Sequence, residues 1–146
     1  KSLTVINYDI EDGLKTFSNK KFDVAILSQT LQAIKDVEKV IIEMTRVAKA
    51  SIISFPNFAY QPLREMMFQE GKAPKTEGWY GYEWYNTPNK RFPSIADFED
   101  FCNLKNISIL RSVFLNSEKG IQITEKPNLN ADNAIFVLGD PEKITR

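Results

Sequence analysis

The chain has 146 residues, 42% of them hydrophobic and 26% charged, and its 19 basic and 19 acidic side chains cancel. This composition predicts one globular domain over residues 1–146, and the lack of a basic excess argues against nucleic-acid binding. The sequence contains no histidine and one cysteine, which excludes a Ser-His-Asp hydrolase, a zinc hydrolase and an internal disulfide within this chain.

The chain opens on an apolar run without an initiator methionine. Leu3 to Tyr8 is rich in β-branched and aromatic residues and predicts a first strand, followed by an acidic, turn-rich stretch from Asp9 to Gly13. The start lacks a signal-peptide pattern, and no apolar run reaches the roughly 20 residues that cross a bilayer. We therefore expect a cytoplasmic protein without membrane contact, whose N-terminus has been truncated or processed.

The next segments alternate between strands and helices. Phe22 to Leu27 is almost continuously apolar, which indicates a strand that is buried on both faces, as in a parallel sheet. Asp36 precedes a helix whose apolar residues recur at helical spacing up to Ala48, and Ser51 to Phe55 is the following strand. Pro62 to Glu70 predicts a short helix, with Pro62 in its first turn.

The second half begins with a long irregular segment, Lys72 to Pro93, and an irregular segment of this length is typical of a functional loop. Its aromatic cluster consists of Trp79, Tyr80, Tyr82, Trp84 and Tyr85. Ser94 is then expected to cap a helix that places Cys102 on its apolar side. Two strands follow, Ile107 to Leu115 and Asn133 to Leu138, separated by a polar loop. Without a helix between them, they are expected to form an antiparallel edge pair.

Three predicted strands end in polar residues, and ligands of open α/β sheets bind at the carboxyl ends of strands. These polar positions are Asp9, the run Ser28-Gln29-Thr30, and Asn57. Asp9 and the run Ser28-Gln29-Thr30 each have an alternative role, because short polar side chains also bond to the backbone of their own turn.

Together these pieces resemble the MetW family of methionine-biosynthesis proteins, from about Val5 to Leu138. The matching runs are Asp9-Ile10-Glu11-Asp12-Gly13-Leu14, Phe22-Asp23-Val24-Ala25-Ile26-Leu27-Ser28-Gln29-Thr30-Leu31-Gln32-Ala33, Ser54-Phe55-Pro56-Asn57-Phe58 and Trp84-Tyr85-Asn86-Thr87-Pro88-Asn89. The chain departs from the family at Asn86, where Asp is usual, and at Lys90-Arg91, which add positive charge.

The resemblance implies an α/β fold, a Rossmann-like S-adenosylmethionine-dependent methyltransferase sheet that lacks its first two strands and is mostly parallel with an antiparallel edge pair. It implies S-adenosylmethionine or S-adenosylhomocysteine as cofactor, with Asp9 and Ile10 at the adenine and with Ser28, Gln29 and Thr30 lining the cleft. The family's glycine-rich turn has no counterpart, since Gly-x-Gly is absent. A separate piece, a second copy in a homo-oligomer, or a rearranged sheet is needed to fill the gap.

The resemblance also implies a partner, homoserine O-acyltransferase, whose activity the chain would support through protein contact. Trp84, Tyr85, Asn89 and Arg91 are the candidate substrate or partner surface, with core packing of the rings and a solvated loop as the alternatives. Two other functions stay open. One is an S-adenosylmethionine-dependent methyltransferase acting on a small molecule, for which the sequence identifies no catalytic residue, and the other is an inactive fragment.

Overall fold

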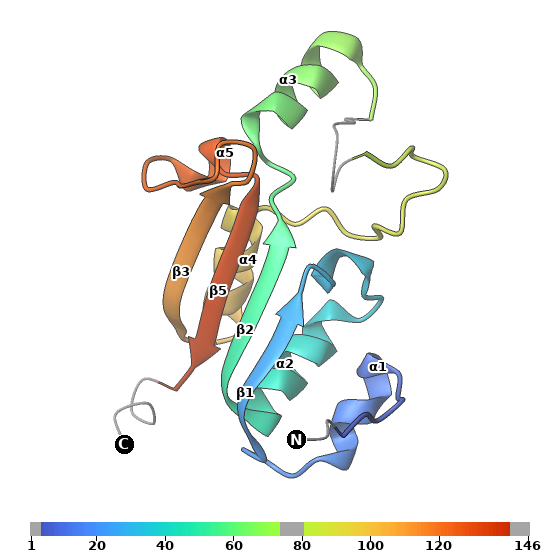
Figure 1. The fold of residues 1–146 in the computed structure, drawn as a ribbon, viewed down its shortest axis with the longest axis vertical. Helices are drawn as coiled ribbons and strands as arrows, with labels where there is room; N and C mark the ends of the chain where they lie inside the picture. The colour runs from blue at the N-terminus through green and yellow to red at the C-terminus, as the bar shows by residue number, and fades with distance from the viewer. Residues whose placement is uncertain (1–3, 74–80, 141–146) are drawn as a thin grey trace.

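The computed structural model describes residues 4–73 and 81–140, which form a five-stranded sheet with order β1-β2-β5-β3-β4 (Figure 1). The strands are β1 (Phe22–Ser28), β2 (Ala48–Pro56), β3 (Ile109–Asn116), β4 (Ile121–Gln122) and β5 (Asn133–Gly139). β1 and β2 pair in parallel, whereas β5 pairs antiparallel with both β2 and β3, and β4 antiparallel with β3. The expected antiparallel pair of the last long strands is confirmed. Three of the four described strand pairings are antiparallel, which is more than the expected mostly parallel sheet would have.

The helices connect and cover these strands. They are α1 (Ile10–Gly13), α2 (Val37–Val47), α3 (Gln61–Glu70), α4 (Ile95–Leu104) and α5 (Pro127–Asn130), with two 3-10 turns, η1 (Leu14–Thr16) and η2 (Leu31–Ala33). Within the described ranges, none of the helices combines the length and the apolar character needed to cross a membrane.

Local signals explain where the longer helices begin and end. The carboxylate of Asp36 accepts the backbone N–H of Lys39 at the start of α2. Ser94 and Asp97 form a reciprocal capping box at the start of α4, as predicted. α3 carries proline in its first turn and ends at Gly71, whose φ of +63° is a backbone conformation that glycine adopts without strain.

One face of the sheet carries the core. α2 and α4 lie on the same side of the sheet (Figure 1), and their apolar side chains join those of β1, β2 and β5 in one buried cluster. At its centre Phe55 stacks on Phe136 with ring centroids 5.9 Å apart, and Phe98 from α4 lies 4.6 Å from Phe136. These rings hold α4 against the sheet, because apolar burial is the dominant favourable term in folding.

The opposite face is uncovered at β1. Val24 and Ile26 point away from α2 and are 48% and 68% exposed, whereas Leu27 on the covered face is 4% exposed. β1 is also an edge strand of the described sheet. The strand itself is confirmed, but the expected burial on both faces is wrong, because no described element packs against the second face.

The expected first strand is wrong for the residues that the structure describes. Residues 4–9 have no regular structure, and Val5 is 86% exposed. Strand-like composition is not sufficient, since a strand needs a neighbouring backbone to satisfy its N–H and C=O groups. The segment instead leads into α1 and η1, which lie against α2 and are tied to it by hydrogen bonds from Arg46 to the carbonyl groups of Leu14 and Phe17.

The expected loop between the last two long strands contains short elements, namely β4 and α5. The irregular character of the segment before α4 is confirmed for its described part, residues 81–93. Trp79 and Tyr80, which belong to the expected aromatic cluster, lie outside the described residues.

Candidate functional site

The polar run after β1 lies at the carboxyl edge of the sheet. Gln29 has φ of +50°, a conformation that is uncommon for a residue with a Cβ atom. Its side-chain amide donates to Ser54 Oγ at 3.3 Å and to Asn133 Oδ1 at 3.0 Å. Ser54 Oγ in turn lies 3.4 Å from Ser28 Oγ. The ends of β1, β2 and β5 are therefore joined by side chains that the sequence could not place together.

Gln29 keeps one polar atom without a partner. Its side-chain oxygen is buried and accepts no hydrogen bond within the described part of the chain, and the side-chain oxygen of Gln32 is in the same situation. The two residues are linked, since the Gln32 amide donates to the Gln29 carbonyl at 2.9 Å. Unpaired buried polar atoms and unusual backbone angles concentrate at ligand sites.

Asp9 and Ile10 begin α1. One Asp9 carboxylate oxygen accepts the backbone N–H of Glu11 at 2.9 Å, so this side chain caps its own turn, which is the alternative role considered for it. Asp9 and Ile10 are both exposed. Gly13 is buried, and a Cβ atom there would lie 2.7 Å from the Cβ atom of Tyr8, so the close turn requires glycine.

Residues 29–35, which follow β1, connect the predicted cofactor residues at the end of β1 with those at the start of α1. The Glu11 carboxylate accepts the backbone N–H of Lys35 at 2.8 Å. Arg91 donates from Nη2 to the Lys35 carbonyl at 2.6 Å, and its backbone N–H bonds to the Gln32 carbonyl at 3.0 Å. Residues 29–35 thus contact both α1 and the segment that precedes α4.

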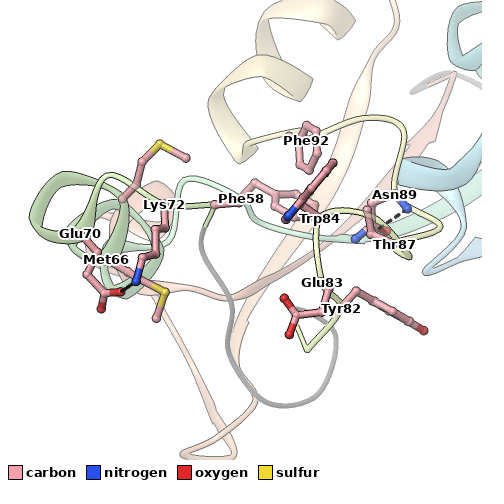
Figure 2. Close-up of a pocket in the computed structure, with 12 residues that line it drawn as sticks. Phe58, Met66, Glu70, Lys72, Tyr82, Glu83, Trp84, Thr87, Asn89 and Phe92 are labelled. Atoms are coloured by element: carbon pink, nitrogen blue, oxygen red, sulfur yellow. Dashed lines mark hydrogen bonds and ion pairs between the residues drawn. The ribbon is translucent and has the colours of Figure 1, made fainter.

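A cleft of about 990 Å³ opens between α3 and residues 81–93 (Figure 2). Phe58 and Phe92, which both line the cleft, meet edge to face with ring centroids 5.1 Å apart, and Met66 lines it from α3. Figure 2 shows Trp84 beside these two rings, while Tyr82 and Glu83 stand apart from them. The lining of the cleft therefore joins apolar side chains from segments that are distant in sequence.

Two of the predicted surface residues line this cleft. Trp84 is 78% exposed and forms an edge-to-face contact with Tyr85, which is 70% exposed, so core packing is wrong for both rings. Asn89 donates its backbone N–H to Thr87 Oγ at 3.1 Å. Arg91 turns away toward Lys35 and lines a smaller cleft beside α2 and α4.

Sequence reasoning missed the contribution of α3. Met66 and Met67 line the cleft, and Phe68 beside them is 92% exposed. The sequence does contain a signal for this role. The polar and apolar residues of α3 are only weakly separated onto two sides, which is typical of a helix that does not cover a core. α3 projects beyond the carboxyl end of β2, away from the sheet (Figure 1).

The predicted cofactor residues do not line either cleft that the described residues form. This holds for Asp9, for Ile10 and for Ser28–Thr30. The unpaired oxygen of Gln29 could accept from a ligand donor, which fits one side of an S-adenosylmethionine site. Across residues 4–73 and 81–140, no three His, Cys, Asp or Glu side chains gather as metal ligands would.

Comparison with known proteins identifies the family. The family model described as methionine biosynthesis protein MetW matches residues 1–138. The chain belongs to the MetW family. A curated relative from Rhodopirellula baltica, named bifunctional methionine biosynthesis protein MetXA/MetW, is 44% identical over 140 residues, which are 94% of this chain and 22% of the relative. This MetW-family chain therefore spans about a fifth of the length of that relative.

Solved structures show which fold the MetW-family chain has. A SAM-dependent methyltransferase from Archaeoglobus fulgidus superposes with a TM-score of 0.62 at 8% identity, covering 92% of this chain and 66% of the other. One from Thermotoga maritima gives 0.61 at 16% identity, covering 92% of this chain and 62% of the other. The α/β methyltransferase fold class expected from the sequence is confirmed.

Proposed function

We propose that this MetW-family chain supports a homoserine O-acyltransferase through protein contact. The observation that carries the proposal is the relative from Rhodopirellula baltica, whose name joins MetXA and MetW in one bifunctional chain. We take its MetXA part to be the acyltransferase. Joining two modules in one chain raises the effective concentration of each module at the other. A fused relative therefore supports the hypothesis that the two modules bind each other.

The exposed rings before α4 are consistent with such a contact. Trp84 and Tyr85 are far more exposed than the phenylalanine rings of the core. Trp and Tyr are enriched at protein interfaces, because they combine apolar area with a polar group and lose little side-chain entropy. Asn89 lines the same cleft as Trp84 and adds a side-chain amide there. Arg91 points toward Lys35 instead.

The test is an activity and binding assay with the 146-residue chain. The homoserine O-acyltransferase of the same source is measured alone and with added MetW-family chain, and complex formation is followed by sedimentation. We expect a complex and faster acyl transfer. Unchanged activity together with independent sedimentation of the two proteins would refute the proposal.

A second part of the proposal concerns the cofactor. Asp9, Ile10, Ser28, Gln29 and Thr30 would contribute one side of an S-adenosylmethionine or S-adenosylhomocysteine site, with the Asp9 carboxylate accepting from the adenine amino group. The cofactor supplies a transferable methyl group when bound, and the residues named here only bind and orient it.

Calorimetry with S-adenosylmethionine and S-adenosylhomocysteine tests this site. Asp9→Ser keeps a capping oxygen but removes the carboxylate, so it should preserve α1 and weaken binding roughly tenfold. Asp36→Ser makes the same change at the cap of α2 and should leave binding unchanged. Equal affinities for the unmodified chain and Asp9→Ser would remove Asp9 from the site.

A further inference from the structure

Residues 29–35 are bonded to the segment that precedes α4. The Gln32 carbonyl accepts the backbone N–H groups of Lys90 and Arg91, at 2.8 and 3.0 Å. The Arg91 side chain adds a bond from Nη2 to the Lys35 carbonyl at 2.6 Å. Gln32 is only 6% exposed, so water cannot easily replace its backbone partners. A shift of this turn that keeps the bonds must therefore carry residues 90 and 91 with it.

The same turn contains buried acceptors that lack a partner. The side-chain oxygens of Gln29 and Gln32 accept no hydrogen bond within the described residues. The Gln32 amide donates to the Gln29 carbonyl at 2.9 Å, so the two side chains belong to one unit. Gln29 also has φ of +50°. Unpaired buried acceptors and an unusual backbone angle both raise the free energy of this conformation, so a ligand that supplies donors can favour a second one.

A cofactor reaches these two oxygens only if the turn moves. Both oxygens are buried, whereas Ser28 and Thr30 on either side of Gln29 are exposed. S-adenosylmethionine carries amino groups that can donate, so a cofactor at the exposed positions would gain hydrogen bonds if the turn presented its acceptors. A ligand shifts a conformational equilibrium by the difference in its affinity for the two states. Cofactor binding would therefore drive the movement of the turn.

The residues that the turn carries lie next to the predicted partner surface. Asn89 directly precedes Lys90 in the chain, and Trp84 and Tyr85 are five to six residues before it. The two rings are 78% and 70% exposed and contact each other edge to face. A turn that is held by a cofactor fixes the end of this segment, and an ordered segment loses less conformational entropy when a partner binds. An occupied cofactor site should therefore strengthen partner binding.

We propose that the turn of residues 29–35 couples cofactor occupancy to binding of the acyltransferase. This inference rests on both parts of the proposed function and adds the regulation that links them. Coupling between two binding sites is reciprocal, so the acyltransferase should raise the affinity for the cofactor by the same factor.

The dissociation constant of the acyltransferase and the 146-residue chain, measured with and without saturating S-adenosylhomocysteine, tests the inference. We expect binding to be about fivefold or more tighter with the cofactor. Calorimetric titration of the cofactor, with and without the acyltransferase, should give the same ratio. A smaller ratio, or weaker binding with the cofactor, would overturn the inference and leave both parts of the proposed function intact.

Two matched arginine variants locate the coupling. Arg91→Met removes the bond to the Lys35 carbonyl and should reduce the ratio about twofold or more. Arg64→Met is the control, because Arg64 is also exposed and donates to backbone carbonyl groups outside this turn. The ratio is taken within each variant, so a change in basal affinity cancels. An undiminished ratio in Arg91→Met, or an equal loss in Arg64→Met, would overturn the inference.

Failure of the proposed function gives a different result. A chain that does not bind the acyltransferase, or does not bind the cofactor, loses that part of the proposed function and the coupling with it. Unchanged thermal unfolding of both arginine variants excludes misfolding as the cause of a lost ratio.

Discussion

The sheet core and the α3 cleft both contain aromatic rings in contact, yet only the core is closed. Phe55 and Phe136 are fully buried, with ring centroids 5.9 Å apart. Trp84 and Tyr85 are as close, at 5.6 Å, but remain 78% and 70% exposed. Contact between rings therefore does not distinguish a core from a surface cluster. What distinguishes them is whether regular elements enclose the rings on all sides.

The difference implies a division of roles. Rings between α4 and the sheet stabilise the fold, because their removal from water is complete. The ring of Trp84 at the cleft is expected to contribute little to folding, because it keeps most of its area in water. Variants of the core rings should therefore lower the free energy of unfolding, whereas variants of the exposed cleft rings should leave it nearly unchanged.

The largest effect is expected from truncating a core ring. Phe136→Ala should lower the free energy of unfolding by about 3–5 kcal/mol, since the cavity would lie among the rings of Phe55, Phe98 and Phe114. Trp84→Ala should change it by less than about 0.5 kcal/mol. Urea unfolding followed by circular dichroism measures both, and similar losses would contradict the comparison.

The second-largest loss of stability is expected at the junction between the sheet core and the α3 cleft. The buried Asn57 side chain donates to the carbonyl groups of Asn128 and Ala131 and accepts the backbone N–H of Ala59. Asn57→Ala leaves these groups unpaired and should cost about 2–3 kcal/mol. Asn103→Ala, on the exposed side of α4, is the matched control, and an equal loss there would show that the Asn57 bonds are not stabilising.

A smaller effect should depend on pH. The hydrogen bond from Arg46 lowers the pKa of Glu43 below its ordinary value of 4.5, and the two side chains are 29% and 19% exposed respectively. A lowered folded pKa adds stability that is present above the unfolded pKa and is lost as pH falls through the folded value. Glu43→Gln should therefore cost about 1 kcal/mol at pH 7 and progressively less below pH 4.5. A loss of stability that does not change with pH would exclude the Glu43–Arg46 ion pair as its cause.

The smallest effect is expected when the native protein is exposed to a reagent that labels thiol groups. Burial raises the pKa of Cys102 to about 11, with Glu99 contributing, and the residue is fully buried under α4. At pH 8 the thiol is therefore protonated as well as inaccessible. A thiol-specific reagent should label it in urea but not in the native protein, as read by intact mass. Rapid labelling without urea would mean that α4 opens readily.

Features that depend on neighbouring residues could be predicted from the sequence. The cap at Ser94, the start of α2 after Asp36 and the end of α3 at Gly71 are confirmed, because each needs only hydrogen bonds or backbone angles within a few positions. The polar run after β1 was also placed correctly at a strand end. Its bonds to Ser54 and Asn133 were not foreseen, because they join strands that are distant in sequence.

The sequence by itself determined the MetW resemblance, the longer helices and the strands β1, β2, β3 and β5, within a few residues at their ends. Only the tertiary structure decided that residues 4–9 form no strand, that one face of β1 stays uncovered and that α3 forms a cleft with residues 81–93. The physical reason is that caps and periodicity are satisfied locally, whereas strand pairing and burial require a partner surface that local sequence does not specify.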